Sequence, residues 1–317
     1  MMQTVIRWSK RAAIALVIAL VAVLGVRAWE SLSGPPLEPW HTFVPAELPA
    51  DEIARTDWNG YLAAEQAAFD EVRREVSGKL APRARVASNR YFDGSPLDPA
   101  RFTTDWNRSF VLEPAGAPVG AVVLLHGLTD SPYSMRSVAR RYRDRGYVAV
   151  VIRLPGHGTV PAGLTGVDWQ AWSQATRLAV REARRRVPAP APLHVVGYSN
   201  GGALAMKYAL DAIDDRSLPR PDRLVLISPM IGVTSMARFA GIVGWPALFP
   251  SFARAAWLGI VPEFNPFKYN SFPVNGARQS SLVARRLQQQ ISQYAGEGRL
   301  GELAPILTFQ SVVDFTV

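Results

Sequence analysis

Cysteine is absent from the 317 residues of this chain, and histidine occurs only four times. Without cysteine the protein has no disulfides, no thiolate metal sites and no cysteine to carry a lipid anchor. The histidines are not spaced as a pair of ligands on one helix face, which argues against a metal-dependent hydrolase. We therefore predict neither a metal nor another cofactor. The four histidines are His41, His126, His157 and His194.

Acidic residues are few relative to basic ones. The chain has 35 lysines and arginines against 26 aspartates and glutamates, which gives a formal net charge of +9. Arginines stand in runs at residues 140–143 and 184–186. These runs lie in segments with helical periodicity, where charged side chains form the solvated face. No zinc-finger, RNA-binding or helix-turn-helix pattern accompanies them, so nucleic acid is not a predicted partner.

The longest hydrophobic run lies at the amino terminus. Residues 12–26 carry no charge and have basic residues on both sides, a pattern typical of a signal peptide or signal anchor. Residues 6–29 span a bilayer if the basic ends snorkel to its interfaces, and the arginine within the 26–28 cleavage sequence favours an uncleaved anchor. We predict a single-pass anchor over residues 1–29 in the inner membrane. The positive flank is then cytoplasmic, and the rest of the chain is exported.

Residues 30–108 are predicted to be a linker and a helical extension. The proline-rich residues 33–39 are typical of an extended linker. Residues 57–79 have helical spacing and one apolar face, although Glu65 falls within the apolar stripe. This helix is either a stalk or a cap against the main domain. Its apolar face consists of Trp58, Tyr61, Leu62, Phe69 and Val72.

Residues 109–317 alternate short apolar runs with amphipathic segments. The alternation predicts an α/β fold, with a mostly parallel sheet and helices on both faces. The expected strands are 121–125, 148–153, 193–198, 224–227 and 306–310. The expected helices are 134–145, 201–213 and 168–187, the last capped by Asp168. Roughly eighty residues separate the last two strands, which is too many for a simple connection, so we predict an inserted cap at about residues 230–303.

The predicted cap is rich in aromatic residues. Their side chains either line an acyl pocket or form the core of a small domain, and the sequence is consistent with both. These residues are Phe239, Trp245, Phe249, Phe252, Trp257, Phe264, Phe267, Tyr269 and Phe272.

A candidate nucleophile follows the strand predicted at 193–198. Gly197-Tyr198-Ser199-Asn200-Gly201 matches the pattern G-x-S-x-G, in which a serine occupies a sharp turn from a strand into a helix. The strand before the motif and the helix after it are both predicted here. Acyl transfer also needs N–H donors for the oxyanion. Asn200 follows the serine at the positive end of the helix, and Leu128 lies in the glycine-containing loop after residues 121–125, so both are predicted donors.

Four motifs in this order along the chain resemble those of the α/β-hydrolases. They are Leu124-Leu125-His126-Gly127-Leu128, Leu154-Pro155-Gly156-His157-Gly158, Gly197-Tyr198-Ser199-Asn200-Gly201 and Gln310-Ser311-Val312-Val313-Asp314. The likeness covers residues 109–317 and is greatest to the branch of carboxylesterases, monoacylglycerol lipases and serine aminopeptidases. It implies Ser199 as nucleophile, Leu128 and Asn200 as oxyanion donors, and Asp314 as the acid that orients the base.

The resemblance implies a serine hydrolase that cleaves carboxylic esters through an acyl-enzyme. The substrate would be a small-molecule or lipid ester, and an anchor beside the bilayer would suit a lipid. Two alternatives stay open. One is a peptidase similar to serine aminopeptidases, for which Glu263 is available to hold a free amino terminus. The other is a membrane-anchored binding protein of the same fold without catalytic activity.

The general base is the part of this mechanism that the chain lacks. The family order is serine, acid, histidine, and no histidine follows Asp314. We therefore expect the catalytic histidine and the end of the domain to lie beyond residue 317, and the 317-residue chain alone to be inactive. His126 and His157 are expected to support loop structure. Asp130, in a Thr-Asp-Ser-Pro sequence, is expected to be a turn or cap residue.

Overall fold

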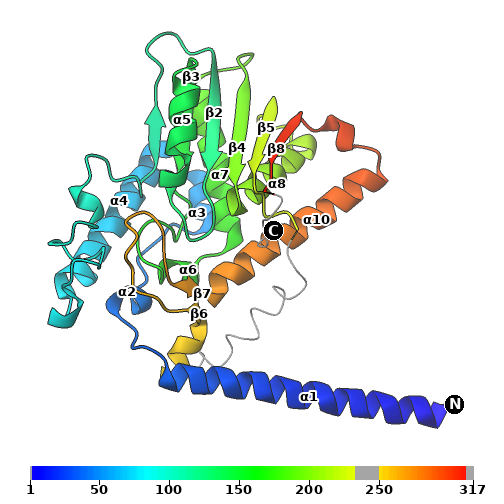
Figure 1. The fold of residues 1–317 in the computed structure, drawn as a ribbon. Helices are drawn as coiled ribbons and strands as arrows, with labels where there is room; N and C mark the ends of the chain where they lie inside the picture. The colour runs from blue at the N-terminus through cyan, green and yellow to red at the C-terminus, as the bar shows by residue number, and fades with distance from the viewer. Residues whose placement is uncertain (1, 233–249, 312–317) are drawn as a thin grey trace.

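A six-stranded sheet forms the centre of the molecule (Figure 1). The structure is a computed structural model that describes residues 2–232 and 250–311. The strand order is β1-β3-β2-β4-β5-β8, and only the β1–β3 pair is antiparallel. The predicted mostly parallel sheet is confirmed. The strands are β1 (Phe110–Leu112), β2 (Gly120–Leu125), β3 (Tyr147–Ile152), β4 (Leu193–Tyr198), β5 (Arg223–Ile227) and β8 (Ile306–Phe309).

Helices cover both faces of this sheet. Side chains alternate between the two faces along each strand, so an apolar strand can pack against helices on both sides. On one face Val123 of β2 belongs to a core cluster with residues of α7 (Trp169–Arg186) and α8 (Asn200–Asp214). On the other face Val122 packs in a cluster with residues of α5 (Arg136–Arg143). Strand β2 is therefore buried on both sides, which explains its unbroken apolar sequence.

Most predicted elements occur within two or three residues of their expected bounds. The cap of α7 is as predicted, since the Asp168 carboxylate accepts a hydrogen bond from the Ala171 N–H at 2.8 Å. The helix predicted at 134–145 is two residues shorter at each end, because a 3₁₀ turn at Pro132–Met135 precedes α5 and the helix ends at Arg143. The edge strand β1 was not predicted from the sequence, since its three half-buried residues carry little periodicity.

The amino-terminal helix α1 (Met2–Ser33) extends away from the sheet (Figure 1). Its residues Ile6–Ser33 are long and apolar enough to cross a membrane, and none of the most apolar window is buried. A signal sequence at this position would have the same features. The membrane and the orientation thus stay predictions. Near the carboxyl end of α1, the carbonyls of Ser31 and Leu32 accept hydrogen bonds from the Arg254 guanidinium at 2.6 and 3.2 Å.

The extension after α1 packs on the main domain. It contains α2 (Pro39–Thr42), α3 (Ala50–Arg55) and α4 (Trp58–Glu75), and a 3₁₀ turn at Ser77–Lys79 follows α4. The helix predicted at 57–79 is therefore shorter than expected, and its first turn is capped by Asp57. Ile53 and Tyr61 belong to the same core cluster as the sheet, which places α4 against the domain rather than in a free stalk. A boundary at residue 109 stays a prediction.

Glu65, which interrupts the apolar stripe of α4, binds a buried arginine. Its Oε2 accepts a hydrogen bond from Arg153 Nε at 3.1 Å, and the two side chains are 3% and 1% exposed. Glu47 binds the two terminal nitrogens of the same guanidinium at 2.7 and 2.9 Å. Burial lowers the pKa of Arg153, but the two carboxylates together have the larger effect, so the pKa is raised. This ion network joins the extension to the residue that follows β3.

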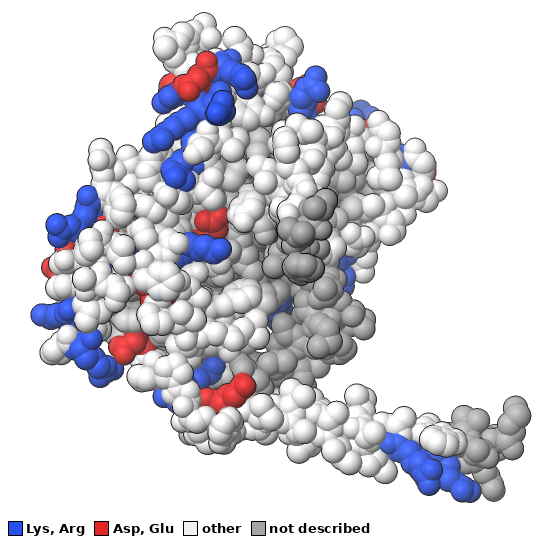
Figure 2. All heavy atoms as spheres, viewed as in Figure 1, with Lys and Arg blue, Asp and Glu red and all other residues white. Residues whose placement is uncertain are grey.

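The arginine runs lie on helices, as predicted. Figure 2 shows basic side chains gathered at the top of the molecule over α5, whose Arg140 and Arg141 are exposed. On α7, Arg185 and Arg186 both bind Glu182, at 2.7 and 2.6 Å. These charges thus lie on solvated or ion-paired helix faces.

The predicted cap contains a long helix, α10 (Val274–Gly296), and a small antiparallel sheet of β6 (Trp257–Gly259) and β7 (Phe272–Pro273). Trp257, Phe267 and Tyr269 are buried, which favours a packing role for these three aromatic residues. Phe239, Trp245 and Phe249 lie outside the described residues. The short elements are α6 (Gly163–Gly166) and 3₁₀ helices at Pro82–Ala84, Pro99–Arg101, Pro250–Ala256 and Leu300–Glu302.

The ion network generates a stability prediction. Glu65→Gln keeps the shape of the side chain but removes the charge beside the buried Arg153 guanidinium. We expect it to lower the free energy of unfolding by about 3 kcal/mol in urea denaturation. Asp51→Asn is the matched control, because it breaks an exposed ion pair with Arg55, and a change below about 1 kcal/mol is expected. Equal effects of the two substitutions would contradict a structural role for the network.

Candidate active site

Ser199 occupies a sharp turn between β4 and α8. Its backbone has φ 53° and ψ −117°, a conformation that residues other than glycine rarely adopt. Within the described residues four hydrogen bonds hold it: the Ser199 N–H donates to the Ile227 carbonyl at 2.9 Å, and the Ser199 carbonyl accepts from the N–H groups of Gly202 at 2.9 Å, Met230 at 3.0 Å and Ala203 at 3.3 Å. The turn presents the half-buried serine side chain at the carboxyl end of the central strand.

Glycines around the serine leave no room for a side chain. A Cβ on Gly197 would lie 2.3 Å from the Gly201 carbonyl oxygen, and a Cβ on Gly201 would lie 2.3 Å from the Leu125 carbonyl oxygen. Both contacts are with backbone atoms, which cannot rotate away. The two glycines of G-x-S-x-G therefore let α8 start directly against the ends of β4 and β2.

The loop after β2 lies against the nucleophile candidate. A Cβ on Gly127 would come within 3.3 Å of the Ser199 Cβ, so the loop backbone passes close to the serine. Leu128 follows in this loop, and Asn200 is the first residue of α8, directly after the serine. Within the described residues, neither the Leu128 N–H nor the Asn200 N–H donates a hydrogen bond. The two predicted oxyanion donors thus flank Ser199 with uncommitted N–H groups.

Asp130 stabilises this loop from within. Its Oδ1 accepts the Ser131 N–H at 2.8 Å, and its carboxylate also accepts hydrogen bonds from the Gly127 backbone and the Ser134 side chain. Burial raises the pKa of Asp130, and these hydrogen bonds act in the opposite direction. The prediction of a turn residue agrees with this arrangement. The loop is also joined to the cap region, because the Tyr269 N–H donates to the Thr129 carbonyl at 2.7 Å.

His126 and His157 are buried at the base of the same region, with rings 5.0 Å apart. His126 Nε2 accepts the Leu154 N–H at 3.0 Å, and His126 Nδ1 donates to the Gly127 carbonyl at 2.9 Å. Burial lowers the pKa of His126 to about 4 and that of His157 well below its usual value. In the described part of the chain neither ring forms a hydrogen bond with Ser199. The two histidines hold loops, as predicted.

The remaining histidines lie in other places. His41 Nε2 donates to the Ser271 hydroxyl at 3.0 Å, and burial lowers its pKa to about 4. His194 belongs to strand β4, and its Nδ1 lies 3.3 Å from the hydroxyl of Tyr142 on α5. Asp314, the predicted orienting acid, lies outside the described residues.

Two side-chain contacts at the cap bear on the alternatives. Glu263 is 1% exposed, and its two oxygens accept the N–H groups of Asn270 at 3.0 Å and Ser271 at 2.7 Å. Its carboxylate therefore holds the backbone before β7. Ser280 of α10 donates to Asn200 Oδ1 at 2.8 Å, which joins the cap helix to the residue after the nucleophile. The sequence carries no signal for this contact, because the two residues are 80 positions apart. Among the described residues no cluster of side chains fits a metal ion.

Comparison with known proteins identifies the family of this chain. A family model described as "Alpha/beta hydrolase family" matches residues 122–312. A thermostable monoacylglycerol lipase of Bacillus sp. (strain H-257) is 34% identical over 92 residues, 29% of this chain and 35% of the lipase. The magnesium-chelatase 30 kDa subunit of Rhodobacter capsulatus is 31% identical over 148 residues, 44% of this chain and 42% of the subunit. The matches thus span less than half the length of each curated relative.

A solved structure supports the fold. A metagenome-derived lipolytic enzyme superposes with a TM-score of 0.50 at 20% sequence identity, covering 65% of this chain and 88% of the other. At this identity the match concerns the arrangement of strands and helices alone.

The packing at the turn predicts which glycines tolerate a methyl group. Gly201→Ala would place its Cβ against the Leu125 carbonyl, and we expect unfolding free energy to fall by at least about 2 kcal/mol. Gly276→Ala is the control, because this helical glycine of α10 has no atom closer than 3.7 Å to an added Cβ. It should be neutral or stabilise by about 0.5–1 kcal/mol. Thermal and urea unfolding measure both, and a harmless Gly201→Ala would contradict the close approach.

Proposed function

Because the chain belongs to the alpha/beta hydrolase family, we propose that it is a serine hydrolase that cleaves carboxylic esters through an acyl-enzyme on Ser199. The observation that carries the proposal is the strained turn at Ser199, with φ 53°, beside the loop that contains Gly127. Strain of this kind persists only where the surrounding structure enforces it, and it is a common feature of active sites. The family alone would not assign a role to this serine.

The reaction proceeds in two acyl transfers. Ser199 Oγ attacks the ester carbonyl carbon and gives its proton to the base, and the carbonyl oxygen becomes an oxyanion held by the N–H groups of Leu128 and Asn200. The tetrahedral intermediate collapses, the bond to the alcohol breaks, and the base returns the proton to the leaving alcohol. Water then attacks the acyl-enzyme with the same base, which releases the acid and restores Ser199.

Asp314 is the proposed orienting acid, and the proposed base is a histidine in the family position after that acid. The buried His126 supports this assignment indirectly, because both of its ring nitrogens are committed to backbone groups. A base must instead reach the serine oxygen and become positively charged, which burial of this ring opposes.

An ester lipid is the proposed substrate class. Two separate features support it: the matched relative named as a monoacylglycerol lipase, and an apolar helix suited to a membrane anchor. The predicted anchor would keep the domain on the exported side of the inner membrane. The peptidase alternative loses its candidate amine-binding group, because the Glu263 oxygens already accept two backbone N–H groups.

Removing the serine hydroxyl tests the nucleophile. Ser199→Ala in the protein at its natural length should lower kcat for p-nitrophenyl butyrate by roughly four or more powers of ten, because no acyl-enzyme forms. Ser137→Ala, at an exposed serine of α5, should leave the rate unchanged. Retention of ordinary activity by Ser199→Ala would refute the role of Ser199.

A second experiment tests the position of the base. Residues 1–317 expressed alone should hydrolyse the same ester several powers of ten more slowly than an enzyme with a complete triad. An ordinary rate that depends on Ser199 would leave the nucleophile intact and show that the base lies within these residues.

Acyl chain length tests the substrate class. With p-nitrophenyl esters from acetate to palmitate, kcat/KM should rise from acetate to medium or long chains, since each buried methylene contributes about 0.8 kcal/mol. Each rate is corrected by the rate of Ser199→Ala on the same ester. A sharp preference for acetate would contradict the lipid assignment while leaving the ester hydrolase intact.

A further inference from the structure

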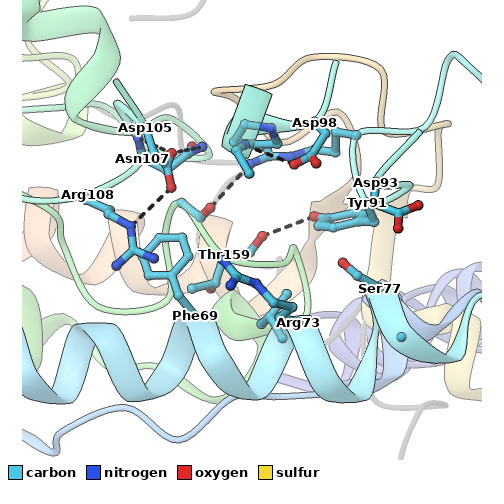
Figure 3. Close-up of a pocket in the computed structure, with 16 residues that line it drawn as sticks. Phe69, Arg73, Ser77, Tyr91, Asp93, Asp98, Asp105, Asn107, Arg108 and Thr159 are labelled. Carbon is cyan, nitrogen blue, oxygen red and sulfur yellow. Dashed lines mark hydrogen bonds and ion pairs between the residues drawn. The ribbon is translucent and has the colours of Figure 1, made fainter. Parts of the chain in front are cut away.

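A cavity separate from the candidate active site lies between α4 and the loop that follows β3 (Figure 3). Its volume is about 370 Å³, and none of Ser199, Leu128 and Asn200 lines it. Figure 3 shows α4 below the cavity and the segment with Asp98 above it. Most of the wall comes from residues 69–108, which precede the region matched by the family model. Membership of the family therefore assigns no role to this cavity.

Arg90 places a buried guanidinium group without a directly bound carboxylate in the cavity wall. The side chain is 2% exposed, and its guanidinium donates to the carbonyls of Asn265 at 3.2 Å and Gly158 at 3.3 Å. Its Nε has no partner among the described residues, and no carboxylate among them forms an ion pair with it. The Glu263 carboxylate, whose oxygens accept backbone N–H groups, acts on this charge through space and offsets part of it without binding the guanidinium group. A buried cation without a bound carboxylate is unfavourable, and an anion in the cavity would relieve it.

A second arginine extends into the same space. Arg73 rises from α4 into the cavity in Figure 3, and within the described residues it forms neither a hydrogen bond nor an ion pair. Within the described residues, none of the three aspartates of the wall forms an ion pair with Arg73. Asp105 binds Arg108 at 3.2 Å, Asp98 caps the turn at Ala100, and the Asp93 carboxylate points away from the centre. Arg73 and Arg90 are therefore guanidinium groups of the wall that no carboxylate of the described residues binds directly.

Apolar groups form the rest of the wall. The Phe69 ring and the Val72 side chain come from α4, and the Tyr91 ring also lines the cavity, with its hydroxyl bound to the Thr159 carbonyl at 3.2 Å. The Tyr91 hydroxyl is thus committed, which leaves its ring as an apolar surface. A ligand that fits this wall combines an anionic group with an apolar body.

We propose that this cavity binds a small organic anion that carries one carboxylate or phosphate group on an apolar body. The anionic group lies between Arg73 and Arg90, where charge-assisted hydrogen bonds from two guanidinium groups are available. The body lies against Phe69 and Val72. The site is separate from the proposed ester hydrolysis at Ser199.

Calorimetric titration of the full chain at low ionic strength tests the site, with benzoate and phenyl phosphate as anionic probes and benzyl alcohol as the neutral probe. At least one anion is expected to bind more tightly than the alcohol, and the tighter of the two identifies the preferred group. Arg73→Ala should weaken anion binding by about five- to tenfold, the loss expected for one charge-assisted hydrogen bond. Arg74→Ala removes a neighbouring exposed charge outside the cavity, and less than a twofold change is expected.

Two further variants locate the binding. Ala100→Trp places a large ring in the cavity wall and should abolish binding, while an unchanged melting temperature shows that the protein is folded. Ser199→Ala should bind both anions as the unmodified chain does, so this result is independent of hydrolysis. Equal binding of benzyl alcohol, equal effects of Arg73→Ala and Arg74→Ala, or the absence of any binding at millimolar concentration would each overturn the proposal.

Discussion

The backbone of Ser199 is the constraint on which the site depends. A serine with φ 53° is stable only because hydrogen bonds with the start of α8 and with residues 227–230 fix it and glycines on both sides allow the segments to approach. The same close packing brings the Gly127 loop against the serine at the start of α8. Within the described residues the N–H groups of Leu128 and Asn200 donate no hydrogen bond, so both are available to an oxyanion in the proposed mechanism.

The amino-terminal extension contributes to this arrangement from a distance. The buried Arg153 guanidinium, bound by Glu47 and Glu65, also donates to the His157 carbonyl at 2.9 Å. The His157 ring packs on His126, which precedes Gly127 in the loop beside the serine. A continuous set of buried contacts therefore runs from α4 to the loop at Ser199. The extension is a structural part of the domain. It also forms most of the wall of the cavity at Arg73.

The sequence predicted the elements with strong periodicity, and its local motifs indicated the candidate site at Ser199. Strand β4 has its predicted bounds, and the α/β-hydrolase fold is confirmed by the family match and the superposed structure. Contacts between distant residues were beyond sequence reasoning. Glu65 looked like a defect in an apolar stripe because its partner, Arg153, is 88 residues away. The Ser280 contact with Asn200 and the cavity at Arg73 likewise depend on how separate segments pack, for which single-sequence patterns carry no information.

Covalent labelling tests the central claim most directly. The protein at its natural length would be treated with a fluorophosphonate, which forms a stable adduct with activated serine nucleophiles, and the modified peptide would be located by mass spectrometry. One adduct on Ser199, absent from Ser199→Ala and unaffected in Ser137→Ala, is the predicted result. An adduct on another residue, or ester hydrolysis without any adduct on Ser199, would contradict the account.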